Sequence, residues 1–400
     1  MRKETSVLIY YSRFATVIGG GEYRPLLLAA EFQKRGCAVT MAVIYDTLIV
    51  ETAERYGIEL DTNRLKIVQI KPKGKFGKKV DSVLPIYAIQ RLKALAKNAD
   101  ICISAQNIID FGKPAHHLIC DIRQGQFGDT AFCDYAHRCS YGPLRKLCRI
   151  VRYWLANSLL RPMFGIRPIW KIVADRREHL YPNSVYVDNL MRGFYGEINS
   201  TIFYPPTTFS NEVVVVRRDP YLVTYIGRIN PEKRIETIID IVDRARRLSG
   251  KDLKLDIAGM LTDSWYSAEI KRRASQTDWV RLKGFVYGPE KMDFLARGTY
   301  AIHAERDEAF GISITEYLKA GSIAIVPDEG GTKEIVDSPA LTYASEDEAA
   351  QILARLLSDD TFREEMHRHC QARAEMFTRE ADMERQREFV DNLLESLPDR

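Results

Sequence analysis

Residues 300–327, YAIHAERDEAFGISITEYLKAGSIAIVP, contain two short apolar runs separated by a helical pattern. The runs at 300–304 and 322–327 are rich in Ala, Ile and Val, which is typical of strands buried on both faces. A helix beginning at about residue 312 would connect them. A strand, a helix and a second strand in this order predict two parallel strands of an α/β sheet.

The same alternation of apolar runs and helical patterns extends along most of the chain. In the first half we predict strands at 6–12, 39–45, 65–71, 100–105, 117–122 and 171–175, with helices at 22–35 and near 82–97. In the second half we predict strands at 221–227, 254–259, 280–286, 300–304 and 322–327, alternating with helices at 231–248, 264–276, 289–297, from about 312, and at 331–337. The final forty residues are rich in charge and predict helices.

A Pro-containing stretch, INSTIFYPPTTFSN at 198–211, interrupts the alternation. Consecutive prolines continue neither a helix nor a central strand, so this stretch predicts a hinge. The fold class is therefore α/β, with two Rossmann-like, doubly wound parallel-sheet domains facing each other across a cleft. The predicted parts are a first domain at 1–197, the hinge, a second domain at 212–375, and a C-terminal helix at 376–400 that packs back toward the first domain.

The bulk composition places the chain among soluble globular proteins. Of the 400 residues, 46% are apolar and 28% are charged, and no apolar run is long enough to cross a membrane. The seven cysteines are scattered and include no C-x-x-C, which favours reduced thiols and a cytoplasmic location. Cys133, His137 and Cys139 lie close together, but their spacing matches no common zinc pattern. The beginning of the chain does not have the pattern of a secretory signal.

Two segments concentrate positive charge although the net charge is only +4. The first, Lys71–Lys79, has five lysines and no acid, and the second, Arg138–Arg177, has ten Lys or Arg against one acid. The second also contains Tyr, Trp and Phe, and this mixture favours contact with an anionic membrane surface. A solvated basic face is the structural alternative. Nucleic acid is a third, but no nucleic-acid-binding motif supports it, so we expect no such partner.

A glycine-rich segment, Gly19, Gly20 and Gly21, follows the first predicted strand and precedes a helix. Glycines allow a close approach of the backbone to a ligand, and a helix N-terminus favours an anion. The segment is not G-x-G-x-x-G, so a dinucleotide fingerprint is not supported. A plain glycine turn remains the alternative.

The segment Gly227–Lys233 follows strand 221–227 and holds two cations, Arg228 and Lys233. A lysine in the first turn of a helix opposes the helix dipole, and a bound anion would explain its presence there. Arg228 and Lys233 would then hold a pair of phosphates from two sides. The alternative is two ordinary surface cations.

The segment 307–316, DEAFGISITE, follows strand 300–304 and has two carboxylates, Glu308 and Glu316. Ser313 and Glu316 have the spacing of a capping box, which is the structural alternative. A carboxylate is also a good acceptor for the paired hydroxyl groups of a sugar. Together with the two cations of the preceding segment, these carboxylates describe a site for a nucleotide-sugar.

With these residues the chain resembles the retaining glycosyltransferases of family 4, which have the two-domain GT-B fold. The resemblance rests on G-R-x4-K and E-x-F-G-x4-E, and both motifs are present. It implies that Arg228 and Lys233 bind the donor diphosphate, that Glu308 contacts the transferred sugar, and that Glu316 holds the ribose hydroxyls. The catalytic residues would be Glu308, Arg228 and Lys233. The other residues of the nucleotide-sugar site would be Gly19, Gly20, Gly21, Gly227, Phe285, Val286, Phe310, Gly311, Ile312 and Glu316.

Within this family, GGGE, YPP and HAERDEAFGISITEYLKAGSIAIVPDEGG resemble the mannosyltransferases that extend lipid-linked oligosaccharides on the cytosolic face. This likeness implies a hexosyltransferase that acts peripherally at the inner face of a membrane, with a lipid-linked or glycan acceptor. It favours GDP-mannose over UDP-sugars. We expect that no metal cofactor is required, because Arg228 and Lys233 would take the place of a metal at the diphosphate. Cys120 stands where the family often has a histidine. A UDP-sugar transferase of the same fold and a catalytically altered binding protein remain the alternatives.

Overall fold

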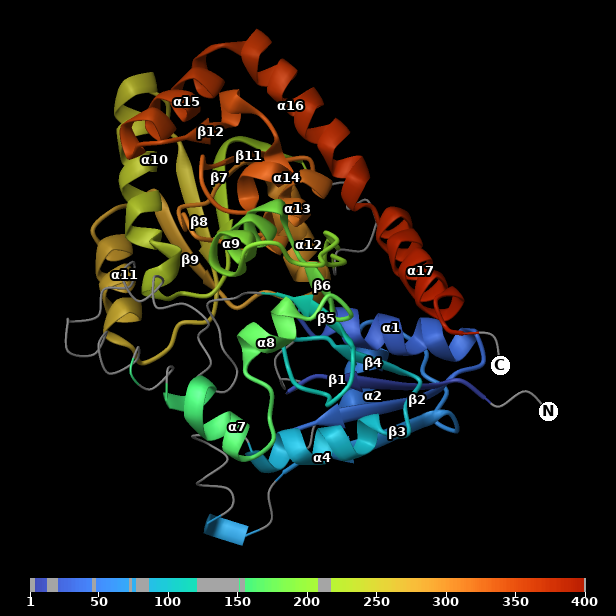
Figure 1. The fold of residues 1–400 in the computed structure, drawn as a ribbon. Coiled ribbons are helices and arrows are strands. Elements are labelled where there is room, and N and C mark those ends of the chain that lie inside the picture. The colour runs from blue at the N-terminus through green and yellow to red at the C-terminus, as the bar shows by residue number, and fades with distance from the viewer. Residues whose placement is uncertain are drawn as a thin grey trace. The chain divides into compact units, whose positions relative to one another are not determined.

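The computed structural model describes residues 4–12, 21–44, 48–71, 74–76, 86–120, 151, 155–207 and 217–398. The chain divides into two compact units (Figure 1). The first comprises residues 1–206 with 383–400, and the second comprises residues 207–382. The last helix, α17 (Arg379–Glu395), begins in the second unit and ends in the first.

In its described part the first unit contains a six-stranded parallel sheet with the order β3-β2-β1-β4-β5-β6. The strands are β1 (Ser6–Tyr10), β2 (Ala38–Val43), β3 (Leu65–Gln69), β4 (Ile101–Ser104), β5 (His116–Ile119) and β6 (His179–Pro182). Successive side chains of a strand point to opposite faces, so a central strand such as β1 has to be apolar at every position. This explains why it appears in the sequence as a continuous apolar run.

Helices cover both faces of this sheet. Val7 and Ile9 of β1 pack in a core with α1 (Tyr23–Lys34), to which the end of α17 contributes Phe389 and Val390. The alternate side chains of β1 pack with α4 (Ile86–Ala96) in a second core on the other face. Figure 1 shows α1 and α4 on opposite sides of the strands. The unit is therefore doubly wound, as the sequence predicts.

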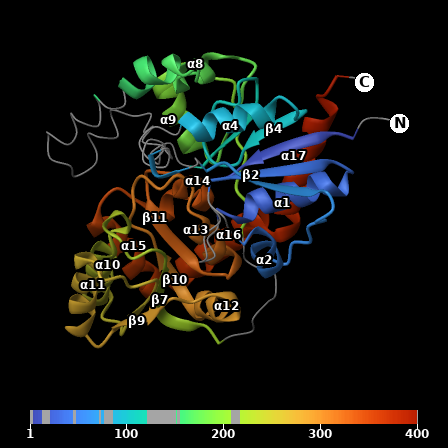
Figure 2. The same cartoon turned by 90° about the horizontal axis from the view of Figure 1, so that it is seen from below.

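The second unit has a six-stranded parallel sheet with the order β12-β11-β10-β7-β8-β9. Its strands are β7 (Asp219–Ile226), β8 (Lys254–Ala258), β9 (Val280–Gly284), β10 (Gly298–Ile302), β11 (Ile323–Pro327) and β12 (Thr342–Tyr343). Its helices are α10 (Ile235–Ser249), α11 (Trp265–Ser275), α12 (Gly288–Arg297), α13 (Ile312–Lys319), α14 (Thr332–Val336), α15 (Glu346–Ser358) and α16 (Asp360–Ala374). Figure 2 shows α10, α11 and α15 on one side of this sheet and α12 and α13 on the other.

Numbered from its own first strand, the second sheet has the same order as the first, and this is the order of a Rossmann fold. In such sheets ligands bind outside the carboxyl ends of the strands, where the strand order reverses. In the second unit this point lies between β7 and β10, which are neighbours in the sheet. The segments that leave these two strands begin at Gly227 and His303, and they include both predicted motifs.

The structure corrects one predicted strand. Residues 171–175 are not a strand, because α8 (Ile169–Ala174) covers most of them. The buried residues of α8 are Ile169, Ile172 and Val173, a helical spacing that a run of five residues does not show. The last strand of the sheet in the first unit is β6, which was not predicted. Nor were α2 (Ile49–Arg55), α9 (Val185–Tyr195), β12 and α15.

Candidate functional site

The turn after β7 is fixed by a buried tyrosine. The Tyr225 hydroxyl donates a hydrogen bond to the carbonyl oxygen of Arg228 at 3.2 Å. A Cβ atom at Gly227 would lie 2.6 Å from that hydroxyl oxygen, so only glycine leaves room for the tyrosine ring. The Arg228 side chain is exposed, and no ion pair joins it to a carboxylate among the described residues.

Lys233 does not lie in the first turn of an α-helix as predicted. It ends a separate 3-10 turn, Pro231–Lys233, which precedes α10. The Asn230 side chain caps this turn by accepting a hydrogen bond from the Lys233 N–H at 3.3 Å. Arg234 then adopts a left-handed conformation with φ of 50°, which turns the chain into α10. The cap and this turn set the position of Lys233.

The Lys233 ammonium lies between two carboxylates. Its Nζ is 2.6 Å from Glu305 Oε2 and also contacts Glu308 Oε2. The three side chains are largely buried, with 13%, 8% and 17% of Lys233, Glu305 and Glu308 exposed. Burial lowers the pKa of Lys233, but the charges of Glu308 and Glu305 outweigh it and raise the pKa overall. The ammonium therefore stays charged at neutral pH, and the cluster has one positive and two negative groups.

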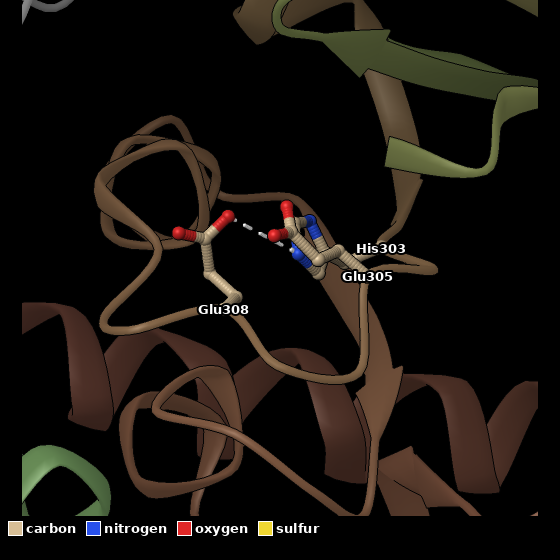
Figure 3. Close-up of side chains that lie close together, drawn as sticks. All are labelled: His303, Glu305 and Glu308. Atoms are coloured by element: carbon tan, nitrogen blue, oxygen red, sulfur yellow. Dashed lines mark ion pairs between the residues drawn. The ribbon is translucent and has the colours of Figure 1, made fainter. Parts of the chain in front are cut away.

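His303 completes this group from the end of β10 (Figure 3). Figure 3 shows its ring beside Glu305 and pointing toward Glu308. His303 Nε2 lies 3.5 Å from Glu308 Oε2. Burial lowers the pKa of His303 to about 4, although Glu308 opposes this shift. The imidazole is therefore neutral at neutral pH and adds no charge to the cluster. Glu305 and His303 were not among the predicted site residues.

The helix that follows does not begin with the predicted capping box. Its N-cap is Gly311, which has no side chain, and Ser313 lies inside the first turn. Gly311 has φ of 99°, and a Cβ there would lie 2.6 Å from Thr332 Cγ2. Gly311 provides no side-chain cap for α13, and the Ile314 N–H donates to the Gly311 carbonyl oxygen at 2.8 Å. An anion can accept hydrogen bonds from the N–H groups at such a helix start.

A second glycine pair supports the loop that carries Glu308. The N–H of Gly331 donates a hydrogen bond to the carbonyl oxygen of Glu308 at 2.7 Å. A Cβ at Gly331 would lie 2.2 Å from the Ala309 oxygen, and one at Gly330 would lie 2.6 Å from the Arg306 oxygen. The two backbones can therefore approach only because residues 330 and 331 are glycines. Gly330 and Gly331 were not among the predicted site residues.

Glu316, the second predicted carboxylate, is also engaged by a lysine. Lys291 Nζ of α12 lies 2.6 Å from Glu316 Oε1 on α13. The Glu316 side chain is 4% exposed, so its charge depends on such a partner. Lys291 was not predicted as a site residue. Lys291 lies seven residues after Gly284, where β9 ends, and in the first turn of α12. This position at a helix start after a strand is the only sequence signal that could have marked it.

The apolar residues predicted to line the site differ in exposure. Phe310 is 2% exposed and its ring packs edge-on against Phe377, so a ligand could reach only its backbone. Val286 is 6% exposed, whereas Phe285 is 45% exposed. The Phe285 ring lies 6.0 Å from the Tyr287 ring at an angle of 23°. This half-exposed aromatic pair offers a flat apolar surface, and Ile312 is partly exposed at the start of α13.

The first unit contains the remaining predicted residues. Gly19 and Gly20 lie outside the described residues, while Gly21 is exposed next to the Tyr11 hydroxyl. Cys120 follows β5 at the carboxyl edge of the sheet, and its N–H donates to Asn107 Oδ1 at 3.0 Å. His117 lies further back and is buried, with Nε2 3.0 Å from Glu178 Oε2. It therefore does not replace a histidine at the position of Cys120.

The basic segments are described only in part. Most of 71–79, and 138–150 with 152–154 of the second segment, lie outside the described residues, as do Cys133, His137 and Cys139. Arg161 is 4% exposed, and Arg167 pairs with the buried carboxylates of Asp110 and Glu178. Arg161 is therefore an interior residue and Arg167 is half-buried in ion pairs, so neither contributes a free charge to a basic surface. No helix in the described parts of the chain is long and apolar enough to span a bilayer.

The side chains of His303, Glu305 and Glu308 could also bind a metal ion. Each offers one donor atom, and these three atoms lie within 4.8 Å of one another. Imidazole and carboxylate suit zinc and several other divalent ions. However, Lys233 Nζ contacts both carboxylates and already supplies a cation there. A metal would have to displace this ammonium, so these residues fit a lysine better than a metal.

Two parallel sheets of the same strand order define the GT-B fold. HepE from Anabaena, solved in complex with UDP and glucose, resembles this chain with a TM-score of 0.66. The match covers 98% of this chain and 100% of HepE at 14% identity, so it concerns the fold.

Residues 208–375 match the family model of Glycosyl transferases group 1, so the second unit carries a glycosyl transferase group 1 domain. A Neurospora crassa protein named GDP-Man:Man(3)GlcNAc(2)-PP-Dol alpha-1,2-mannosyltransferase is 25% identical over 158 residues, which are 35% of this chain and 28% of that protein. The Phosphatidylinositol N-acetylglucosaminyltransferase gpi3 subunit of Schizosaccharomyces pombe is 26% identical over 159 residues, 37% of this chain and 35% of that protein. The matches thus span well under two thirds of either relative.

Proposed function

We propose that this chain is a retaining hexosyltransferase of family 4 that moves mannose from GDP-mannose to a lipid-linked or glycan acceptor. The observation that best supports this proposal is the ion pair between Lys233 and Glu308. It lies at the point where the strand order reverses, within the glycosyl transferase group 1 domain. Mannose and a lipid-linked acceptor are supported by the name of the Neurospora crassa relative.

In the proposed reaction an acceptor hydroxyl forms a bond to the anomeric carbon while the bond from that carbon to the diphosphate breaks. The hydroxyl proton passes to a departing phosphate oxygen. Arg228, Lys233 and the uncapped N–H groups of α13 stabilise the negative charge that develops on the diphosphate. Preorganised stabilisation of this kind is usually the largest contribution to catalysis. Glu308 holds the sugar and Glu316 holds the ribose, and no protein nucleophile takes part.

We also propose that the reaction needs no metal ion, because the Lys233 ammonium lies where a divalent ion would bind the same carboxylates. Sugar transfer should therefore continue at an unchanged rate in excess chelator. A loss of transfer that added magnesium or manganese restores would overturn this part of the proposal.

The experiment supplies radiolabelled GDP-mannose or UDP-N-acetylglucosamine to the purified chain with a polyprenyl-linked acceptor in liposomes. Label from GDP-mannose in the lipid extract is the expected result. The second candidate is transfer of N-acetylglucosamine, which the name of the Schizosaccharomyces pombe relative favours. Label from the UDP-sugar alone would support that candidate. No transfer from either donor, with nucleotide still bound, would favour a catalytically altered binding protein.

We further propose that the first unit rests peripherally on the inner face of a membrane. Leu155, Leu159 and Met163, spaced by four residues, are 37%, 50% and 70% exposed. Phe164 and Trp170 add exposed aromatic rings, and no acid occurs between residues 155 and 174. Lys171 is an exposed cation in the same segment. An apolar stripe next to a cation is suited to the boundary between headgroups and acyl chains.

Flotation with liposomes tests this membrane contact. The wild-type chain should float with vesicles that contain anionic lipid, and the double variant L159E/M163E should stay in solution. A matched double variant at exposed positions elsewhere, L248E/M260E, should float like the wild type. Equal flotation of all three proteins would contradict the assignment to this stripe.

A further inference from the structure

We propose that Glu305 is the positioning residue for Lys233, holding its ammonium in place while Glu308 turns from that ammonium to the transferred sugar. This inference rests on the proposed function, from which the roles of Lys233 and Glu308 are taken. It adds a carboxylate that belongs to neither of the two motifs.

The first observation is that one ammonium is shared by two carboxylates at different depths. Glu305 and Glu308 both lie in the segment between β10 and α13, and both contact Lys233 Nζ. The Glu305 side chain is the deeper of the two, with 8% exposed against 17% for Glu308. Glu308 is therefore the carboxylate with access to a ligand, and Glu305 is the one enclosed with the lysine.

The second observation is the charge of the cluster. Two carboxylates and one ammonium leave an excess of negative charge before any ligand binds, and His303 stays neutral beside them. A donor diphosphate brings more negative charge. An ammonium has three N–H donors, so Lys233 can keep Glu305 and contact a phosphate oxygen once Glu308 has moved away. The ion pair with Glu305 then holds the Lys233 ammonium in position while it also contacts the phosphate oxygen.

The simpler interpretation is that Glu305 only neutralises a buried lysine. In that case its replacement would lower stability and would affect binding and turnover in parallel. The proposed role predicts a different result. In Glu305→Gln the ammonium has only Glu308 as an anionic partner, so Glu308 remains bound to Lys233 and is withheld from the sugar. The site has also lost one negative charge, so diphosphate binding should not weaken.

The kinetic test compares the wild type with Glu305→Gln and with Glu329→Gln. Glu329 is an exposed carboxylate in the loop after β11, and its replacement controls for the loss of one charge near the site. We expect Glu305→Gln to lower kcat by about tenfold to a hundredfold, because small displacements of a catalytic group are costly. Its Kd for GDP should stay equal or fall, and Glu329→Gln should behave like the wild type.

A second measurement needs no turnover. An amine-reactive acylating reagent is applied to each protein, and the modification of Lys233 is followed by mass spectrometry. Lys233 should react faster in Glu305→Gln than in Glu308→Gln, because the deeper carboxylate is the one that holds it. Reaction of Lys233 in Glu305→Gln at the wild-type rate would overturn the inference, and so would a parallel loss of GDP affinity and kcat. Faster labelling in a chain that binds no nucleotide would support the positioning by Glu305 and contradict the proposed function.

Discussion

Lys291 Nζ lies 2.6 Å from Glu316 Oε1 and links α12 to α13. Glu316 is the carboxylate that we expect to hold the ribose of the donor. This carboxylate forms an ion pair with a cation of the neighbouring helix. A ribose must therefore bind at an existing ion pair rather than at an isolated carboxylate.

Replacement of Glu316 should weaken nucleotide binding. A hydrogen bond to a charged group contributes about 1.5–3 kcal/mol, so Glu316→Ala should raise the Kd for GDP by about tenfold or more. Titration calorimetry measures this change directly. Glu290→Ala, at an exposed position on the same helix as Lys291, is the control and should bind GDP like the wild type. Wild-type affinity in Glu316→Ala would show that this carboxylate does not hold the nucleotide.

Replacement of Glu308 should mainly affect turnover. Its carboxylate contacts Lys233 and is assigned to the sugar, so Glu308→Ala removes a contact to the part of the donor that reacts. We expect kcat to fall by about a hundredfold or more, as for the loss of other transition-state contacts. The Kd for GDP, which lacks the transferred sugar, should change little. Initial rates combined with calorimetry separate the two effects, and a larger loss in GDP affinity than in kcat would reverse the assignment.

Gly311 should be intolerant of a side chain for two reasons. Its φ of 99° is strained for other residues, and a Cβ would lie 2.6 Å from Thr332 Cγ2. Strain of this kind costs about 1–3 kcal/mol before the steric overlap is added. Gly250 is the matched control, because its φ is 65° and no atom lies within 4 Å of its Cβ position. Urea unfolding should show a larger loss of stability for Gly311→Ala than for Gly250→Ala, and equal losses would contradict the steric argument.

His303 should make the second unit sensitive to acid. Burial lowers its pKa in the folded protein to about 4, below the value of about 6.5 expected when unfolded. Between these pH values the unfolded chain takes up a proton that the folded chain does not, so stability falls as the pH falls from 6.5 toward 4. A shift of this size corresponds to about 3 kcal/mol. The free energy of unfolding of His303→Gln should depend less on pH across this window, and the same slope in both proteins would contradict the prediction.

The sequence was sufficient to predict the alternating fold because most strands of both sheets are buried on both faces. Such strands appear as continuous apolar runs, as in β10 and β11. The edge elements were harder. β12 has only two residues, and α8 buries Ile172 and Val173, which in a short run resemble a strand.

The candidate site was predicted only where residues form a motif. Gly227, Lys233 and Glu308 lie in motifs that follow strands, and the strand order then brings them together. Lys291 and Glu305 belong to neither motif and act through ion pairs that depend on how helices and loops pack. Only their positions shortly after strands β9 and β10 could have marked them. The capping box, the structural alternative for Ser313 and Glu316, was wrong because the N-cap is Gly311, two residues before Ser313.

The most direct test of the account is the thermal stabilisation of the wild-type chain and of Arg228→Ala by GDP-mannose, UDP-N-acetylglucosamine and ADP-glucose. At a concentration a hundredfold above its Kd, a bound donor stabilises the folded state by about 2.7 kcal/mol. We expect this stabilisation of the wild type with GDP-mannose and a clear loss of it in Arg228→Ala. The Arg228 side chain is exposed, so its removal should not disturb the fold. No stabilisation by any of the three donors, or equal stabilisation of both proteins, would contradict a nucleotide-sugar site at Arg228, Lys233 and Glu308.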